Sequence, residues 1–562
     1  MVKKLIHFLY EKYSVLAETG IVAYMLCSFM TVTVLDSIGP LSLMVKLIRY
    51  GLYAFLSLMC LAYYFGSHPA DSLKEALFSL FAWLKDHLLL CTALITSILN
   101  FVLSGSLIPF AIVLLLMAAR PLNLQHLLKM IFITQLAAAV LVVALSQTGL
   151  LTDLIYSSTR GRYRHSLGYI YPLEMHSHFF FLFLLGAYLF QKKYGFIAFA
   201  VISAVNYGVF YMTLARTNFV LIEACALLLL IAVKVPREVW EKVFGWKYWK
   251  PLLFAGTILM FTAPIAACLM YTPNSRFWDF ADDLMTGRLS LCREALETYP
   301  LTLFGQSIEW LGSGGPNPTY IWQDEYNFAD ISYVKDLLDY GVILYGLVAA
   351  GYYWMMQNFS KKANAAGIVC CISVLLCSIM EPRLLSISLN SFLLFLCIPL
   401  LYTNRRLIQW MKEDVPVYGP WSRLPKAGRI AAVGAVLALC AGFVLYMNSL
   451  HGFGERRQAI RALENERKDW QAEIMSFEKP EDMDPYLYSR YMAHALKDSS
   501  AAYEEMVKKV PIGRLRSYYI NKEDFNSIQA KDAKEEEYKQ KFEEIGSLTS
   551  QEIQKQLSPA QN

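Results

Sequence analysis

Long apolar segments alternate with short polar ones along most of this chain. Many of the apolar segments approach the ~20 residues that an α-helix needs to cross a bilayer. The segments 88–103 and 107–119 are short enough to form a re-entrant hairpin instead of two crossings. The pattern predicts an all-α polytopic integral membrane protein with about thirteen transmembrane helices. The predicted spans are 15–35, 51–65, 88–103, 107–119, 128–150, 172–190, 196–214, 218–233, 252–271, 337–356, 365–380, 389–401 and 430–447.

The composition agrees with this interpretation. Of the 562 residues, 56% are hydrophobic and 17% are charged, which is too apolar for a soluble protein of this size. No small-residue cleavage site follows the first apolar segment, so we interpret it as a retained span rather than a signal peptide. Only Cys292 of the 11 cysteines lies outside the predicted spans. Since no CxxC pair or disulfide framework is visible, the cysteines are interpreted as packing residues.

The distribution of Lys and Arg predicts the orientation in the membrane. Basic residues gather at Lys3 and Lys4 and in the segments 191–194, 234–250, 361–362 and 404–429. The positive-inside rule places these segments, and with them the N-terminus, in the cytoplasm. Lys46 and Arg49 do not fit, because they fall at the outer start of the second predicted span. The inner loops also account for the net charge of +5, which therefore gives no reason to expect nucleic-acid binding.

This orientation divides the chain into two parts. Residues 1–447 form the predicted transmembrane domain, with large outer loops at 151–170 and 272–336, and the last span delivers residues 448–562 to the outer side. The terminal part is rich in Lys, Glu, Gln and Ala, and its segments 455–477 and 532–545 are predicted to be helical. We therefore expect an extracytoplasmic helical C-terminal region. It either recognises a regulator, the product or the cell wall, or is a solvated appendage.

Several arginines lie on the outer side, where the positive-inside bias normally excludes them. The planar guanidinium binds phosphate bidentately, so we expect these residues to hold a diphosphate presented from the outer half of the membrane. For the arginines of the first outer loop, binding to anionic lipid headgroups is the alternative. The outer arginines are Arg160, Arg162, Arg164, Arg216 and Arg288.

Two of these arginines lie at predicted helix starts. Arg216 occupies the tight outer turn between two spans, where burial is costly without a partner. The alternative to a phosphate partner is Glu223, two turns further along the same helix and about 10 Å away along its axis. Arg288 follows Thr286-Gly287 and lies near a helix N-terminus, whose N–H groups attract anions. The same Thr-Gly-Arg arrangement would also serve simply to cap a loop helix.

Other residues of the outer regions suggest roles in sugar chemistry. Asp330, just before the span 337–356, is a candidate general base for a sugar hydroxyl, and the alternative is a solvated loop carboxylate. Aromatic side chains of the second loop either stack on sugars or pack the loop's own core; they are Trp310, Tyr320, Trp322 and Tyr326. His176 and His178 have a spacing that diverges on a helix, so we expect no metal site.

Four motifs in sequential order resemble the Wzy-type polysaccharide polymerase and O-antigen ligase superfamily. They are R-x-S-L-G-Y-x-x-P (164–172), A-R-T (215–217), T-G-R…P-L…F-G (286–305) and D-x-S-Y…Y-G-V-I (330–343). The resemblance covers residues 1–401 and implies a GT-C-type glycosyltransferase fold in the bacterial cytoplasmic membrane. It implies metal-independent and cofactor-independent transfer of an undecaprenyl-diphosphate-linked glycan.

The resemblance also implies roles for individual residues. Arg216 and Arg288 would engage the diphosphate, and Arg164 would support them. The base would be Asp330 or another carboxylate, because the chain departs from the family pattern at this position. The remaining residues of the expected substrate-binding set are Arg160, Arg162, Tyr333, Arg293 and Glu381. Further expected partners are membrane lipids and the chain-length regulator and flippase of a polysaccharide assembly system.

One departure from the family pattern narrows the expected activity. O-antigen ligases have a His-Asn pair where this chain has Asp330-Ile331, and the second outer loop contains no His. This favours a polymerase of capsule, exopolysaccharide or O-antigen repeat units over a polysaccharide ligase. A SEDS-type glycan polymerase and a docking role of the C-terminal region remain alternatives. A lipid-linked glycan flippase, from another class, should carry charges within its spans and show two similar halves.

Overall fold

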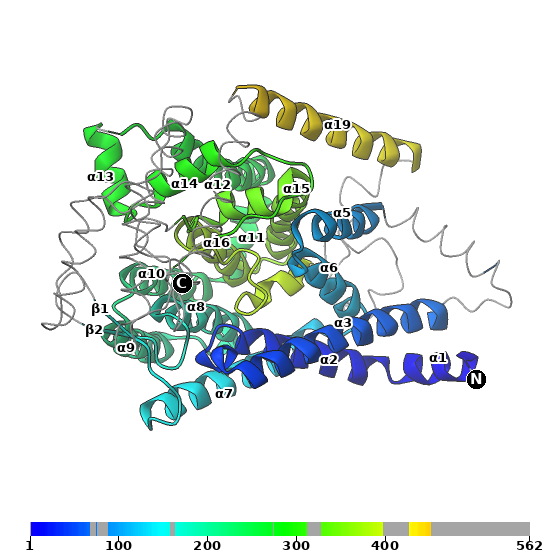
Figure 1. Ribbon diagram of the computed structural model, residues 1–562, viewed down its shortest axis with the longest axis horizontal. Coiled ribbons are helices and arrows are strands. Elements are labelled where there is room, and N and C mark those ends of the chain that lie inside the picture. The colour runs from blue at the N-terminus through cyan, green and yellow to red at the C-terminus, as the bar shows by residue number, and fades with distance from the viewer. Residues whose placement is uncertain are drawn as a thin grey trace, which may run out of the picture. The chain divides into compact units, whose positions relative to one another are not determined.

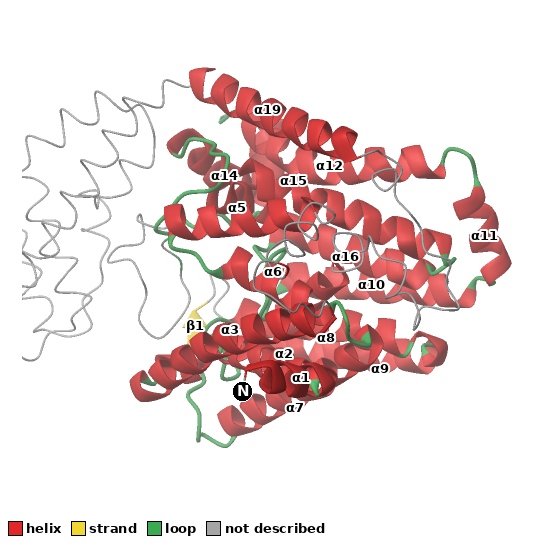
Figure 2. Cartoon of the chain, turned by 90° about the vertical axis from the view of Figure 1, so that its right-hand side faces the viewer, coloured by secondary structure: helices red, strands yellow, loops and turns green. Residues whose placement is uncertain are grey.

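A computed structural model describes residues 2–67, 75, 88–157, 163–273, 275–310, 312, 327–396 and 426–450. The described part is mostly helical, with a single short β-hairpin (Figure 2). Its helices include 6 that are long and apolar enough to cross a membrane, in keeping with an all-α membrane protein. These are α2 (Tyr13–Met30), α3 (Gly39–Ser67), α7 (Leu124–Gln147), α9 (Phe196–Thr213), α10 (Arg216–Lys234) and α12 (Trp249–Met270).

The other described helices are shorter, less apolar or interrupted. The longer of these are α5 (Leu88–Ser104), α6 (Ile108–Ala119), α8 (Pro172–Leu189), α15 (Ser332–Lys361), α16 (Ala365–Met380) and α19 (Lys426–Leu450). The shorter ones are α1 (Val2–Glu11), α11 (Arg237–Gly245), α13 (Arg276–Leu284) and α14 (Arg288–Thr298). Three short 3-10 helices are η1 (Val34–Ser37), η2 (Gln191–Lys193) and η4 (Ser391–Leu396).

Most predicted spans fall on α-helices, with two differences. The apolar segment 389–401 forms only the 3-10 helix η4 in its described part. Here the Asn390 side chain holds the local loop, because it donates to Leu384 O at 2.7 Å and accepts the Phe392 N–H at 3.2 Å. The second span begins earlier than predicted, so that Lys46 and Arg49 lie inside α3. There the Arg49 guanidinium lies over the Tyr24 ring, 5.8 Å from its centre.

The chain separates into two compact units. The first comprises Met1–Met270, Leu301–Ile308 and Asp330–Val444, and the second comprises Tyr271–Pro300, Glu309–Ala329 and Leu445–Asn562. Most of the described residues of the segment 272–336 therefore belong to the second unit. The two units are described separately below.

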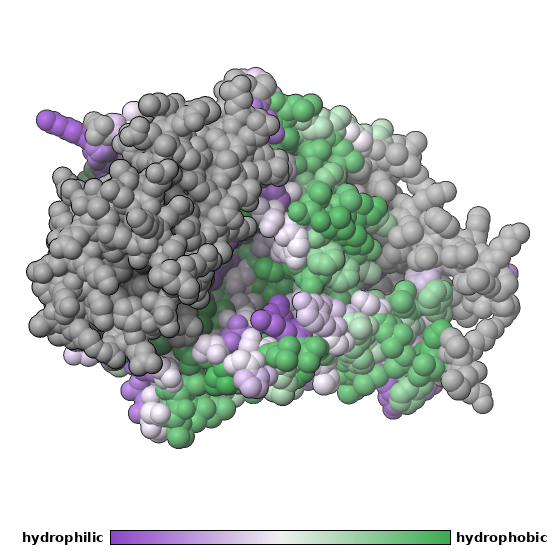
Figure 3. Space-filling model, viewed as in Figure 1, coloured by the Kyte–Doolittle hydropathy of each residue, from purple (hydrophilic) through white to green (hydrophobic). Residues whose placement is uncertain are grey.

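The centre of the first unit is formed by α8, α10 and α16, which lie side by side in Figure 1 and contact one another. Around them, α15 packs on α12 and α16, and α2 packs on α3 and α7. Helices at the edge of the unit expose apolar side chains, for example Leu47 on α3, Val140 on α7 and Ile197 on α9, and Figure 3 shows wide apolar areas on the visible surface. Exposed apolar surface of this extent is expected where lipid is the surrounding medium.

The helix α15 is kinked at Gly341, whose φ of 81° and ψ of 165° are not helical. The extended segment Leu301–Ile308 fits against the kink: Val342 N donates to Thr302 O at 3.0 Å, and Gln306 N donates to Asp339 O at 3.3 Å. A Cβ atom at Gly341 would lie 2.4 Å from the backbone nitrogen of Gly305. Two glycines from separate sequence motifs therefore allow a close backbone approach that side chains would prevent.

The first outer loop is folded as a hairpin. β1 (Ile155–Ser157) pairs antiparallel with β2 (Tyr163–His165), and Tyr156 is opposite Arg164. Asp153 fixes the base of the hairpin, because its carboxylate accepts the backbone N–H of Leu167 at 2.8 Å and lies 2.6 Å from His165 Nδ1. Figure 1 shows the hairpin beside α9, which β2 contacts.

Candidate functional site

The starts of α8 and α10 meet polar groups of neighbouring helices in the first unit. Asn218, in the first turn of α10, donates to Ser177 Oγ of α8 at 3.1 Å. Glu174, in the first turn of α8, forms an ion pair with Arg383 in the loop that follows α16. Both members of this pair are largely buried, with 10% and 15% of the side-chain surface exposed for Glu174 and Arg383. The starts of α8 and α10 are thus joined to each other and to the end of α16.

The start of α15 joins the same place. Ser332 Oγ donates to the backbone carbonyl of Glu381 at 2.7 Å and accepts Leu384 N–H at 3.1 Å. No side chain caps the N-terminus of α8, α10 or α15, so their first N–H groups and their dipoles favour a negative charge. We call these residues the helix-start cluster: Arg164, Tyr171, Glu174, Arg216, Asn218, Ser332, Glu381 and Arg383.

Arg164 reaches the helix-start cluster from the hairpin. Its Nε donates to the backbone carbonyl of Thr213 at 3.1 Å, and its Nη1 donates to Tyr171 Oη at 3.4 Å. The guanidinium also lies 5.4 Å from the centre of the Tyr171 ring. Thr213 ends α9, directly before the turn that carries Arg216. The structure therefore brings Arg164 to the turn on which Arg216 lies.

Arg216 is the first residue of α10 and is exposed. Among the described residues, its side chain forms no hydrogen bond or ion pair. The turn before it holds Leu214 at a φ of 52°, a conformation that is uncommon for residues other than glycine. A guanidinium with no partner in the described part of the chain, next to an uncapped helix start, is suited to binding an anion.

Glu223, the alternative partner considered for Arg216, bonds to residues of α9 instead. The Glu223 carboxylate accepts Asn206 Nδ2 and Ser203 Oγ, each at 2.7 Å. The helical rise places Glu223 about 10 Å deeper than Arg216, where polar side chains of α9 satisfy it. The prediction considered only partners on the same helix, whereas the real partners come from the adjacent one.

A buried polar chain supports the turn from inside the helix bundle. His176 is fully buried on α8; its Nδ1 lies 3.1 Å from Thr213 Oγ1 and its Nε2 lies 2.9 Å from Asn206 Oδ1. Asn206 also donates to the backbone carbonyl of Phe219 at 3.1 Å. The chain from Thr213 through His176 and Asn206 to Glu223 thus connects α8, α9 and α10 below the turn. Polar residues inside apolar spans were the only sequence signal for it.

The second histidine of α8 points to different partners. His178 Nδ1 lies 2.8 Å from Tyr169 Oη, and its ring lies against Phe29 with 4.7 Å between ring centres. Burial, together with the nearby Glu174 charge, raises the pKa of Tyr169 and keeps its phenol protonated. In the part of the chain that the structure describes, no three His, Cys, Asp or Glu side chains are grouped to hold a metal.

Other residues of the expected set have varied surroundings in the first unit. Tyr333 is fully buried, and its hydroxyl donates to the backbone carbonyl of Leu375 at 2.7 Å, so its contacts are those of a core residue. Glu381 is 2% exposed and interacts electrostatically with Arg383. Asp330 is half-buried and directly precedes the start of α15. Arg383 and Glu174 were not expected from the sequence.

In the second unit, a tight turn between α13 and α14 carries Arg288. Gly287 N–H donates to Asp282 O at 2.9 Å and Thr286 N–H to Asp283 O at 3.1 Å, which is the Schellman pattern of a helix end. Both turn residues are left-handed, with φ of 57° for Thr286 and 78° for Gly287. Arg288 is buried and folds back, so that its Nη1 donates to Thr286 Oγ1 at 2.8 Å.

The start of α14 is already occupied, contrary to prediction. Asp282 Oδ1 accepts Leu289 N–H at 2.8 Å and Ser290 N–H at 3.2 Å. The backbone groups that were expected to face an anion therefore bind a carboxylate of the same unit. Arg293 is also paired within its helix, since its Nε donates to Glu297 Oε1 at 2.7 Å.

Several expected residues lie outside the described part of the chain. They are Arg160, Arg162, Tyr320, Trp322, Tyr326 and the predicted helices 455–477 and 532–545. Of the aromatic residues of the second loop, Trp310 is described and packs within the second unit, 5.9 Å from the Tyr299 ring and 6.3 Å from the Phe328 ring. Its contacts agree with the packing alternative.

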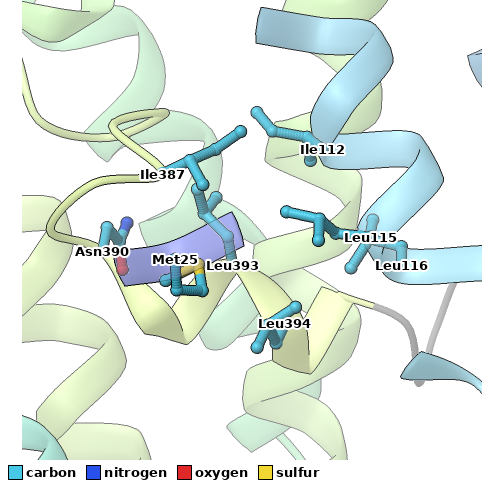
Figure 4. Close-up of a pocket in the computed structure, with 8 residues that line it drawn as sticks. All are labelled: Met25, Ile112, Leu115, Leu116, Ile387, Asn390, Leu393 and Leu394. Atoms are coloured by element: carbon cyan, nitrogen blue, oxygen red, sulfur yellow. The ribbon is translucent and has the colours of Figure 1, made fainter. Parts of the chain in front are cut away.

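A small pocket of the first unit is mainly apolar (Figure 4). It lies between Met25 of α2, residues of α6, and the loop and 3-10 helix that follow α16. Its lining residues are Met25, Ile112, Leu115, Leu116, Ile387, Asn390, Leu393 and Leu394. The pocket has room for no more than a water-sized molecule, so we do not assign a glycan substrate to it.

Comparison with known proteins adds no family assignment. No protein-family model matches the chain, and neither a curated protein nor a solved structure shows significant similarity to it. The functional argument therefore depends on the motifs and on the geometry of the helix-start cluster.

Proposed function

We propose that this protein is a Wzy-type glycosyltransferase that polymerises undecaprenyl-diphosphate-linked oligosaccharide repeat units at the outer face of the bacterial cytoplasmic membrane. The observation that carries the proposal is that Arg164 binds the backbone carbonyl of Thr213, three residues before Arg216, which begins α10 without a side-chain cap. Two guanidinium groups and a helix dipole concentrate positive charge there, as a diphosphate requires. The order of the four sequence motifs supports the same assignment.

In the proposed reaction, the growing glycan binds with its anomeric phosphate next to Arg164 and Arg216. The terminal hydroxyl of a new repeat unit forms a bond to the anomeric carbon, while the bond from that carbon to the phosphate oxygen breaks. The hydroxyl proton passes to a carboxylate, for which Asp330 is the candidate. Undecaprenyl diphosphate leaves, and the arginines stabilise its developing charge.

The proposal extends to the surroundings of the enzyme. It includes a GT-C-type arrangement of about thirteen spans, a cytoplasmic N-terminus and an extracytoplasmic C-terminal region. A flippase would supply the lipid-linked repeat units, and a chain-length regulator would act on the product. No step of the reaction uses a metal or another cofactor.

Polymer formation by the purified full-length protein tests the proposal. Lipid-linked repeat units are added to the protein in nanodiscs, and gel electrophoresis should show a ladder of products. Arg216→Ala and Arg164→Ala should each lower the rate by ~10²–10³, the usual effect of removing one fixed donor at developing charge. Arg237→Ala is the matched control, because Arg237 is exposed on α11 and pairs only with Glu241 among described residues. Full activity of both cluster variants would reject the diphosphate site.

A lipid-linked glycan flippase is the second candidate. The observation that favours it is Glu223, an ionisable residue within a candidate span that is connected to His176 through Asn206. Such residues are frequent along transport pathways. Proteoliposomes loaded with a fluorescent lipid-linked glycan distinguish the two functions. Movement of the glycan between leaflets without elongation would replace the polymerase proposal by a flippase.

A further inference from the structure

The helix α13 of the second unit exposes a continuous apolar face. Phe277 is 68% exposed, Phe280 is 68% exposed and Leu284 is 71% exposed. Their spacing of three and four residues places all three on one side of the helix. Large apolar side chains gathered on one exposed face mark an interaction surface rather than a surface in contact with water.

The orientation of α13 within its unit is fixed by its other residues. Asp282 is buried and binds the first N–H groups of α14. Trp278 is half-buried, and its ring lies 6.4 Å from that of Tyr271. These two residues face the interior of the second unit. A rotation of α13 that buried its apolar face in this interior would expose Asp282 and Trp278 and break their contacts. Asp283 is exposed at the polar border of the helix.

The chain connection indicates what covers this face. The helix α12 (Trp249–Met270) is a candidate membrane span, and only the link 271–275 separates it from α13. A fully extended link of this length reaches about 20 Å at most, so α13 must begin close to the membrane surface. Amphipathic helices in that position bury their apolar face ~5–10 Å into the boundary between headgroups and acyl chains.

We infer that α13 lies flat on the outer leaflet and inserts Phe277, Phe280 and Leu284 between the lipids. The same border of α13 carries the exposed Arg276 and the exposed Asp283, whose opposite charges give no basic border that would attract anionic headgroups, so insertion is expected into zwitterionic lipid as well. The turn after Leu284 leads directly to Arg288. If the proposed function holds, the same insertion keeps Arg288 at the level of the diphosphate of a lipid-linked glycan.

Spin labels on the two sides of α13 test this inference in the full-length protein. Phe280→Cys and the matched control Asp283→Cys are labelled in phosphatidylcholine nanodiscs, and the unsubstituted protein treated in the same way gives the background from its own cysteines. Collisions with oxygen, which concentrates in lipid, are compared with collisions with a water-soluble nickel chelate. The label at position 280 should collide mainly with oxygen, and the label at 283 mainly with nickel.

Two results would overturn the inference. If nickel reaches both labels equally, α13 lies in water. If both reagents are excluded from position 280, protein covers the face, either another part of this chain or a second copy. Because the measurement needs no enzymatic activity, failure of α13 to insert is distinguishable from failure of the proposed polymerase function.

Discussion

Replacing Asn206 with leucine would remove the amide that three other groups of the buried polar chain share. Asn206 contacts His176 Nε2 at 2.9 Å, Phe219 O at 3.1 Å and Glu223 Oε1 at 2.7 Å. Side-chain hydrogen bonds between membrane helices contribute about 0.6 kcal/mol each on average, so three bonds account for roughly 2 kcal/mol. The Glu223 carboxylate, which loses one of its donors, adds about 1–3 kcal/mol to this loss of stability. We expect Asn206→Leu to lower the free energy of unfolding by about 3–5 kcal/mol.

The unfolding equilibrium in mixed detergent micelles measures this loss. Ser203→Ala is the matched control, because it removes a single hydrogen bond from the same Glu223 carboxylate and should cost about 0.6 kcal/mol. Adding Glu223→Leu to Asn206→Leu should restore part of the stability, because the unsatisfied carboxylate is gone. If Asn206→Leu costs no more than Ser203→Ala, the polar chain does not support the turn before Arg216, and the reasoning is refuted.

Two further predictions concern close contacts of the first unit. Gly341→Ala should destabilise the protein by about 3 kcal/mol or more, because a Cβ would lie 2.4 Å from Gly305 N. Thermal unfolding measures this loss. Gly346→Ala is the control, because a Cβ at Gly346 would have nothing within 4 Å. Arg383→Met should cost about 3–5 kcal/mol, because it leaves Glu174 buried without its counter-ion. The double variant Glu174→Met/Arg383→Met should be more stable than Arg383→Met alone, and a still less stable double variant in denaturant titrations would contradict this account.

The sequence predicted the helices well because lipid imposes a simple requirement on them. A spanning segment must be apolar over about 20 residues and must satisfy its own backbone, and both features can be recognised locally. The segment 389–401 does not form the predicted spanning helix in its described part, because Asn390 bonds to its own loop. Hydrophobicity does not reveal this contact. The hairpin was also missed, since its base depends on Asp153 bonding to residues after the second strand.

The candidate site was harder to predict, because its partners are distant in sequence. The predicted outer location drew attention to Arg164 and Arg216, but it did not show that Arg164 reaches Thr213. Glu223 was the alternative partner for Arg216 because only partners on one helix were considered. The carboxylate of Asp282 was overlooked as the cap of α14 because it belongs to the preceding helix. Such pairings depend on how elements fold back on one another.

The close fit of Gly305 against Gly341 has a consequence for the evolution of the outer region. The chain leaves the first unit just after the segment that is bonded to α15, and it re-enters at Asp330, directly before α15 begins. The residues of the first unit on either side of this stretch are therefore fixed, because Gln306 is bonded to α15 and Asp330 directly precedes it. A loop whose two ends are fixed tolerates changes in its sequence and length with little effect on the stability of the fold. The sequence between these fixed points can thus change without a change in the packing of α15.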